Sequence, residues 1–153
     1  MAEIRGCVFP HDLFYDLDLN LWFRPVDDLC FDVGITPFGH ALSGDLYMFN
    51  PKPVGREIES SRAFALVEAA KTVLPVRTPL TARILRINTE PELKPSLINR
   101  DPLGTWLVTL CPSQQDEAHA TLLRGAAVIE RANLLMDLHH FESLDRYEKG
   151  RSA

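Results

Sequence analysis

Residues 64–88 read FALVEAAKTVLPVRTPLTARILRIN and hold a single lysine, Lys71, between two apolar runs. Residues 63–67 precede this lysine and residues 72–76 follow it, and both runs are rich in residues that favour β-strands. Two such runs separated by a short loop predict a β-hairpin with Lys71 at or near its tip. No Asn-Gly or Asp-Gly pair fixes the turn, and the sequence Ala-Ala-Lys is also compatible with a helix.

A lysine in a turn can be simply a solvated charge, which is the ordinary interpretation of such a position. The residues around Lys71 indicate a function beyond that of a solvated charge. Glu68 lies three residues before it, Pro79 lies eight residues after it, and a further β-prone run, residues 83–87, ends at Asn88. This pattern resembles the lipoyl-attachment hairpin of the glycine cleavage H-protein family, which reads Glu-Ser-Val-Lys, a short strand, Pro-Val-Ser-Gly-Glu-Val and then an Asn. The corresponding residues here are EAAK, PLTARI and Asn88, with lysine, proline and asparagine at the family's spacing.

The resemblance implies that Lys71 carries lipoate in amide linkage and that Glu68 helps the attaching enzyme to recognise the hairpin. Such an arm ends in a disulfide that can be reduced, can take a group on one sulfur and can close again. An arm that visits several enzymes needs an exposed and rigid base, which a hairpin tip supplies. The small residues Ala69 and Ala70 leave a modifying enzyme room beside the amine.

Residues 34–45, GITPFGHALSGD, form a second segment that resembles the family, whose pattern is Gly-Ile-Thr-Asp-Phe-Ala and, a few residues later, Gly-Asp. Thr36 suits a helix N-cap and the proline after it suits the first helical position, so we expect a short helix over residues 37–42. We interpret this match as structural. Neither His40 nor Asp45 is expected to take part in chemistry.

A third segment, residues 96–107 (SLINRDPLGTWL), resembles the family runs Leu-Ile-Asn, Asp-Pro-Tyr-Gly and Gly-Trp-Leu, although one residue is missing before Trp106 and Leu103 replaces the usual tyrosine. The resemblance thus runs from about Tyr15 to Leu107. It implies a mainly β fold with helices (α+β), namely a flattened β-barrel of two interleaved sheets, the barrel-sandwich hybrid of lipoyl and biotinyl carriers. The alternating apolar pattern and the turn spacing agree with this fold.

We expect one H-protein-like lipoyl domain over residues 1–153, because this length is ordinary for a domain and 46% hydrophobic residues suffice for a single core. Residues 13–111 would form the barrel core, and residues 13–24 alternate between apolar and polar like one half-buried strand. Residues 1–12 would lead into this strand. Residues 113–140 would form a C-terminal helix with an apolar stripe at helical spacing, and the charged residues after it would fray.

Composition limits the partners that we consider. The net charge of −5 argues against non-specific nucleic-acid binding. The first residues lack the apolar run of a signal peptide, and no uncharged apolar run approaches the length of a membrane span. We therefore expect a cytoplasmic protein with no nucleic-acid partner and no membrane partner.

The three cysteines, Cys7, Cys30 and Cys111, form neither a Cys-X-X-Cys pair nor a zinc pattern. An odd count in a cytoplasmic chain predicts reduced thiols, and buried structural cysteines are expected. Cys7 is the candidate for reactivity, because it lies near the N-terminus. Residues 137–142, DLHHFE, suggest a metal cluster at first sight, but adjacent histidines point to different sides of a helix, so we expect no metal site.

The N-terminal run over residues 4–13, IRGCVFPHDL, resembles a branch of the family, the lipoate-binding proteins of the bacterial heterodisulfide-reductase-like sulfur-oxidation system. The chain also lacks the His-Glu pair that precedes Trp22 in glycine-cleavage carriers. A dithiol arm can hold a low-valent sulfur species while it is oxidised. The sequence therefore predicts a lipoyl carrier that shuttles sulfur intermediates between enzymes of cytoplasmic thiosulfate oxidation.

Other functions stay open. One alternative is the aminomethyl carrier (H protein) of the glycine cleavage system, and one from another class is a non-lipoylated H-like scaffold. A biotin carrier is disfavoured, because biotinylated lysines usually sit between methionines, whereas Lys71 lies between Ala70 and Thr72. The chain is not expected to be an enzyme by itself, since it shows no nucleophile–base pair, phosphate loop or metal-ligand spacing.

The resemblance implies several protein partners. These are the heterodisulfide-reductase-like complex, a lipoate ligase or lipoyl-assembly enzymes, and dihydrolipoamide dehydrogenase. No basic surface is evident in the sequence, so docking is expected to use shape and acidic residues such as Glu57, Glu59 and Glu68.

Overall fold

A computed structural model describes residues 2–152 of the chain, and their side chains as far as residue 148. The strands are β1 (Ala2–Ile4), β2 (Cys7–Phe9), β3 (Phe14–Asp16), β4 (Leu21–Pro25), β5 (Phe31–Ile35), β6 (Leu46–Pro51), β7 (Glu57–Ile58), β8 (Ala63–Ala69), β9 (Thr72–Arg77), β10 (Ala82–Ile87) and β11 (Val108–Pro112). The helices are α1 (Pro37–Ser43), α2 (Thr89–Leu93), α3 (Ser96–Arg100), α4 (Gln115–Thr121), α5 (Ala126–Leu138) and α6 (Leu144–Ser152).

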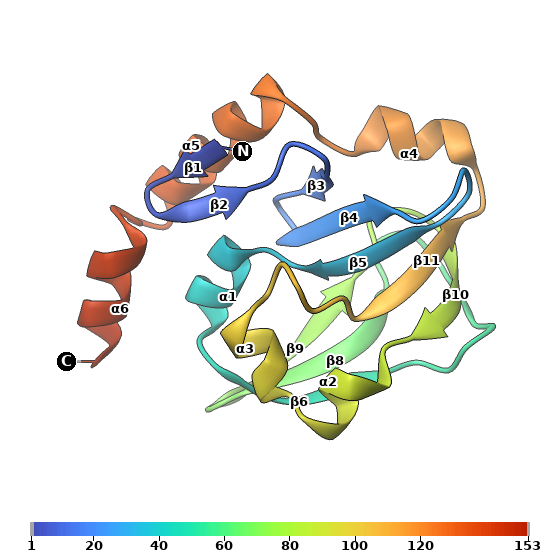
Figure 1. Cartoon of the computed structure of the whole chain (residues 1–153), viewed down its shortest axis with the longest axis horizontal. Helices are drawn as coiled ribbons and strands as arrows, with labels where there is room; N and C mark the ends of the chain where they lie inside the picture. Colours follow the sequence, from blue (N-terminus) through green and yellow to red (C-terminus); the bar gives the residue numbers. More distant parts are fainter. Residues whose placement is uncertain (1, 153) are drawn as a thin grey trace.

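The strands form two main sheets and a small hairpin, and all the paired strands are antiparallel. The larger sheet has the order β3-β4-β5-β11-β10-β7, and the smaller one has the order β6-β8-β9 (Figure 1). β1 and β2 pair only with each other. This mixture of antiparallel sheets and short helices agrees with the predicted α+β class.

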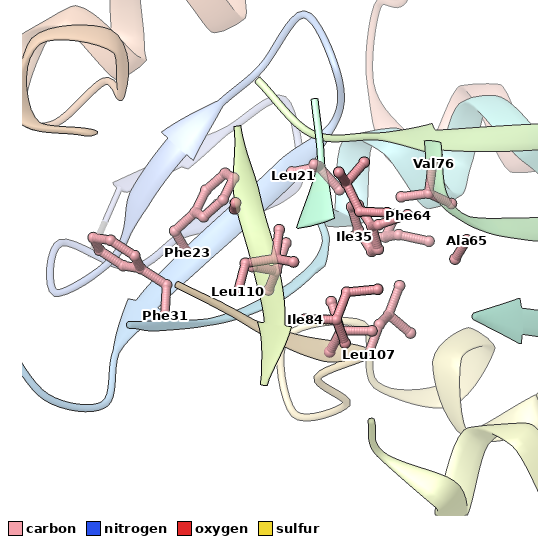
Figure 2. Packing of buried hydrophobic residues seen from close by; sticks show 14 of the residues in the cluster. Leu21, Phe23, Phe31, Ile35, Phe64, Ala65, Val76, Ile84, Leu107 and Leu110 are labelled. Atoms are coloured by element: carbon pink, nitrogen blue, oxygen red, sulfur yellow. The ribbon is translucent and has the colours of Figure 1, made fainter. Parts of the chain in front are cut away.

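The barrel core lies between the two main sheets. From Ala65 onward the residues of β8 alternate, so Ala65 and Val67 are buried while Leu66 between them is exposed. Phe64, where the register shifts, is buried as well. Side chains from both sheets meet in this core, as period-two alternation in half-buried strands dictates. Figure 2 shows part of this core, with Leu21, Phe23, Phe31, Ile35, Phe64, Ala65, Val76, Ile84, Leu107 and Leu110 labelled.

The other face of β3 and β4 carries a second cluster, which we call the outer core. The β1–β2 hairpin, α1 and α5 cover this face (Figure 1). Its large members are Phe9, Leu13, Tyr15, Trp22, Phe38, Met136 and Phe141. Because β4 is covered on both faces, its successive residues Leu21, Trp22 and Phe23 are all buried, which a half-exposed strand would not show.

Trp22 and Gly34 face each other on the paired strands β4 and β5. A Cβ atom at Gly34 would lie 2.3 Å from two carbons of the Trp22 ring, so only glycine leaves room for the indole. The Trp22 Nε1 donates a hydrogen bond to the Pro102 carbonyl at 3.0 Å. The predicted helix that follows is confirmed as α1, and Thr36 Oγ1 caps it by accepting from the Gly39 amide at 3.0 Å.

The prediction of one strand over residues 13–24 was wrong. The segment folds back on itself as the antiparallel pair β3–β4, with Tyr15 opposite Trp22. Asn20 adopts a positive φ of 62°, and the Leu19 amide donates to Asp16 Oδ1 at 3.0 Å, so the turn is held by local hydrogen bonds. Residues 1–12 likewise were expected only to lead into a strand, whereas β1 and β2 form a hairpin.

The prediction of one helix over residues 113–140 was also wrong. The chain leaves α4 at Thr121, and Leu123 forms a two-way backbone bridge with Tyr15, with N–O distances of 2.9 and 2.7 Å. Gly125 then takes a positive φ of 65° before α5 begins. The charged tail forms α6 where fraying was expected, and the Leu144 amide donates to the Arg5 carbonyl at 2.8 Å.

The expectation of three reduced thiols was wrong for two of them. Cys30 and Cys111 form a disulfide, with Cα atoms 4.2 Å apart and 81 positions apart in sequence. Cys30 directly precedes β5, and β5 pairs with β11 so that Phe31 lies opposite Leu110. The next residues along the two strands are therefore direct neighbours. Because the two cysteines are 81 positions apart, no local pattern in the sequence indicates that they pair.

Replacing Gly34 with alanine should lower the free energy of unfolding by about 1–3 kcal/mol, because the new methyl group overlaps the Trp22 ring. Urea unfolding of the wild type and the variant measures this. In a Trp22→Phe background, which lacks the indole carbons that the methyl group meets, the same change should cost less. An equal cost in both backgrounds would show that this contact does not limit residue 34.

Removing the disulfide should also destabilise the fold. The bond joins residues 81 positions apart, and closure of a loop of that size is worth about 4 kcal/mol in the chain-entropy account. We expect reductant to lower the denaturant midpoint of the wild type and to leave a Cys30→Ala, Cys111→Ala variant unchanged. The oxidised protein, once denatured, should titrate as one thiol, Cys7. A titration that finds three thiols in the denatured protein without reductant would contradict the disulfide between Cys30 and Cys111.

Candidate functional site

Lys71 lies at the tip of the β8–β9 hairpin, so the hairpin prediction is confirmed. Ala69 pairs with Thr72, which leaves Ala70 and Lys71 as a two-residue loop. Lys71 is exposed, and among the described residues its side chain has neither a hydrogen-bond partner nor an ion-pair partner. The amine is therefore open to an approaching reagent or enzyme.

Glu68 occupies the solvent side of the hairpin, three residues before the lysine. It lies between Met48 of β6 and Val73 of β9 in the register of the smaller sheet. It is half-buried, yet within residues 2–152 it makes no ion pair and no side-chain hydrogen bond. Glu68 and Lys71 thus form no pair with each other, and the carboxylate is free to meet an external group.

The base of the hairpin is fixed by a dense set of hydrogen bonds around Thr78. The Ser61 amide donates to the Thr78 carbonyl at 2.7 Å, and the Thr78 amide donates to the Arg62 carbonyl at 2.9 Å. The buried Thr78 hydroxyl donates to the Leu80 carbonyl at 2.5 Å. Ser60 Oγ donates to the carbonyl of Pro79 at 2.9 Å. These bonds join residues 60–62, at the start of the hairpin, to residues 78–80, at its end, so the tip stands on a rigid support.

Asn99 holds the strand β6 that borders the hairpin. Its Oδ1 accepts from the Leu46 amide at 2.8 Å and its Nδ2 donates to the Leu46 carbonyl at 2.9 Å, which imitates a strand pairing. His40 Nε2 lies 3.0 Å from Asn99 Oδ1 and 3.4 Å from Asp45 Oδ1. The contacts of His40 and Asp45 are thus those of a structural anchor, in line with the expectation from sequence.

Asn88, the last residue of the family-like hairpin pattern, joins two elements. Its Nδ2 donates to the Trp106 carbonyl at 2.7 Å, and its Oδ1 accepts from the Glu90 amide at 3.2 Å as the N-cap of α2. The cap starts this short helix directly after the end of β10. The side-chain contacts of Asn88 are therefore those of a structural residue.

A pocket of about 90 Å³ lies between the hairpin and α1. Its walls include Leu21, Ile35, Leu46, Val67, Leu74 and Val76. The polar side chains among its lining residues are Asn20 and Ser43, and none of the lining residues is charged. The pocket can take a small apolar group, and it offers no carboxylate to a cation.

An open groove of about 460 Å³ lies at the other end of the hairpin from Lys71, where Ala63 pairs with Arg77. We call it the cationic groove. Its charged lining residues are Lys52, Arg56, Arg62, Arg77, Glu57 and Glu59. The sequence suggested docking through the two glutamates and showed no basic surface, but the structure surrounds these glutamates with four cations drawn from residues 52–77.

Cys7 was the candidate for thiol reactivity, and the structure argues against that. Its side chain is fully buried in the outer core. Burial, with a smaller contribution from the charge of Glu148, raises the pKa of the Cys7 thiol to about 11. A thiol with such a pKa is almost wholly protonated at neutral pH, and the thiolate is the nucleophile.

The part of the chain that the structure describes has neither a metal cluster nor a membrane-spanning helix. Within it, no three residues of the His, Cys, Asp or Glu type come together as a metal site, and His139 and His140 are no exception. No described helix has both the length and the apolar character to cross a bilayer.

Three comparisons with known proteins point to one family. The family model described as glycine cleavage H-protein matches residues 13–133. Glycine cleavage system H protein 2 of Aquifex aeolicus is 32% identical over 132 residues, which cover 86% of this chain and 82% of that protein. The glycine cleavage system H protein of Salinibacter ruber is 37% identical over 110 residues, or 71% of this chain and 87% of that one.

The crystal structure of a glycine cleavage system H protein from Mycobacterium marinum is similar to most of this fold. The TM-score is 0.69 at 27% identity, and the match covers 82% of this chain and 99% of that one. The predicted fold class is thereby confirmed. The β1–β2 hairpin lies before the residues that the family model matches.

Cys7 should not react with iodoacetamide in the native protein at pH 8, because its thiol is buried and its pKa lies near 11. Mass spectrometry after a timed pulse measures the labelled fraction. Denatured protein should label at Cys7 under the same conditions, and this serves as the control. Rapid labelling of the native protein would contradict the buried position of Cys7.

Proposed function

Because the chain belongs to the glycine cleavage H-protein family, we propose that it is a lipoyl carrier protein whose arm is joined to Lys71. One observation carries this proposal. The lysine stands exposed in a two-residue loop at the tip of a hairpin whose base is fixed by hydrogen bonds. A rigid, exposed base suits an arm that has to reach several enzymes.

The residues around Lys71 fit an amide-linked lipoyl group. Ala69 and Ala70 are small, and among the described residues no acidic side chain pairs with the lysine, so acylation breaks no ion pair. When bound, the lipoyl group supplies a disulfide that can be reduced, loaded and closed again. Glu68 is proposed as a recognition residue for the attaching enzyme, since it is close to the lysine in the strand register and has no partner of its own.

For the carried group, the comparisons favour the aminomethyl carrier of the glycine cleavage system. The matching family model and the Aquifex, Salinibacter and Mycobacterium proteins all carry that name. In this role the chain would act with glycine decarboxylase, and dihydrolipoamide dehydrogenase would reoxidise its arm. The chain itself would catalyse no turnover, because the reactions take place on its partners.

A carrier of sulfur intermediates is the second candidate, and two observations favour it. The pocket beside the hairpin contains no carboxylate that would neutralise a protonated aminomethyl group. The run over residues 4–13, which resembles the sulfur-oxidation branch, falls almost entirely before the residues that the family model matches. In this role the partner would be a heterodisulfide-reductase-like complex. The relatives' names do not support this assignment, which rests on the chain's own departures from the family.

The carrier proposal predicts that protein purified from its own cells bears a lipoyl group on Lys71. Intact mass and peptide mapping measure this. Lys71→Arg keeps the charge but cannot be acylated, so it should abolish the modification, whereas Lys94→Arg, at another exposed lysine, should leave it intact. An unmodified Lys71 in cells that lipoylate other proteins would overturn the carrier proposal and favour a non-lipoylated scaffold.

Reconstitution with a partner enzyme distinguishes between the two candidate carried groups. Lipoylated protein incubated with glycine decarboxylase and labelled glycine should acquire label on its arm if it is an aminomethyl carrier. If it does not, and if Lys71→Arg stops thiosulfate oxidation in the parent cell, the sulfur carrier is supported. Normal thiosulfate oxidation in the Lys71→Arg strain would eliminate the sulfur carrier.

A further inference from the structure

The solvent side of the β6-β8-β9 sheet is unusually apolar next to Lys71. Met48, Leu66 and Val73 are 45%, 43% and 51% exposed, whereas such positions on a solvated strand are ordinarily polar. The register aligns them in two rows across the sheet. One row is Met48, Glu68 and Val73, and the next is Asn50, Leu66 and Pro75. We call these six residues the outer face.

Two features distinguish the outer face from scattered surface leucines. Its four apolar residues occupy neighbouring positions of the register on three strands, around Glu68 and beside Asn50, and clustered exposed apolar side chains are typical of an interaction site. Its single carboxylate, Glu68, lies in the middle of it with no partner among the described residues. The outer face begins beside the hairpin tip and extends along β8 and β9 toward the hairpin base.

The surface becomes more cationic from the hairpin tip toward the hairpin base. Pro75, in the second row, also lines the cationic groove, and Arg77 follows it two residues later on β9. The groove has four cationic and two acidic side chains, whereas the whole chain has a net charge of −5. An acidic protein with a locally cationic groove favours partners that are acidic at that place.

We propose that the outer face, together with the cationic groove at its far end, is the docking surface for the enzyme that attaches lipoate to Lys71. That enzyme would present an apolar patch to Leu66 and Val73, a cation to Glu68 and acidic residues to the groove. This inference rests on the proposed carrier function. It extends that function by assigning a surface and the chemistry of the partner that fits it.

The attaching enzyme is the partner that has to touch the hairpin itself. It transfers the lipoyl group from lipoyl-adenylate, so a bond forms between Lys71 Nζ and the carbonyl carbon. The bond from that carbon to the phosphate oxygen breaks, AMP leaves with the electron pair, and the amine loses a proton. The reacting atom is then on the lysine, at the edge of the outer face. Enzymes that load or unload the arm react with its far end, so their chemistry alone requires no contact with the hairpin.

The first test measures lipoylation of unmodified protein by a lipoate ligase that modifies the wild type, with lipoate and ATP. Leu66→Ser and Val73→Ser should each raise KM about tenfold and leave kcat unchanged, since an apolar contact is lost on docking and not in the chemical step. Leu85→Ser is the matched control, because Leu85 is 46% exposed in a strand of the larger sheet. It should leave both constants unchanged.

The second test addresses charge. The KM of the wild type should rise with KCl concentration, because salt screens the attraction between the groove and acidic groups of the enzyme. Arg56→Gln and Arg62→Gln together should raise KM at low salt and flatten the salt dependence. Arg100→Gln, at an exposed arginine of α3, should alter neither. Thermal unfolding of every variant checks that the fold is kept.

The outcomes separate this inference from the function on which it rests. If no lipoate ligase or lipoyl-assembly enzyme modifies the wild type at Lys71, the carrier proposal itself fails. If the wild type is modified and Leu66→Ser and Val73→Ser behave like Leu85→Ser, the docking surface is overturned and the carrier survives. If these variants are lipoylated normally but the loaded protein then fails with its partner enzymes, the outer face serves those enzymes and our assignment of the occupant is wrong.

Discussion

The contact between the Trp22 indole and the bare backbone of Gly34 is the constraint on which the rest of the fold depends. It lets β4 and β5 pair closely while a large ring fills the space above the glycine. The ring belongs to the outer core, whereas its neighbours Leu21 and Phe23 point into the barrel core. The strand β4 thus contributes side chains to two packed cores. A change at this contact therefore alters the packing on both sides of the sheet.

The barrel core in turn supports the hairpin that carries Lys71. The inward side chains of β8 and β9 are buried, and the base is fixed around Thr78, so the flexible element of a carrier has to be the arm and not the protein. The outward residues of the same strands contribute little to stability, because they are exposed. They remain available for contact with another protein, which is the physical basis for assigning docking to that side.

Local signals in the sequence were enough to predict some elements and insufficient for others. The hairpin and α1 were predictable because strand-forming runs and an N-cap act within a few residues. The break at Leu123 depends on a backbone bridge to Tyr15, and the disulfide depends on pairing between β5 and β11. The cationic groove arises because residues 52–62, which include β7, converge with the paired ends of β8 and β9. These features follow from contacts between distant residues, and periodicity in one segment contains no information about them.

The described residues that the family model does not match, at the two ends of the chain, pack on the side of the larger sheet away from the lysine hairpin. The β1–β2 hairpin packs with α1, α5 and α6 over the outer core, while β8 and β9 lie across the barrel core from it (Figure 1). Substitutions there leave the barrel core that supports the hairpin of Lys71 unchanged, because the two clusters share no residue. A shared lysine hairpin identifies the carrier but does not identify what it carries, and the carried group has to be determined from the partner enzymes.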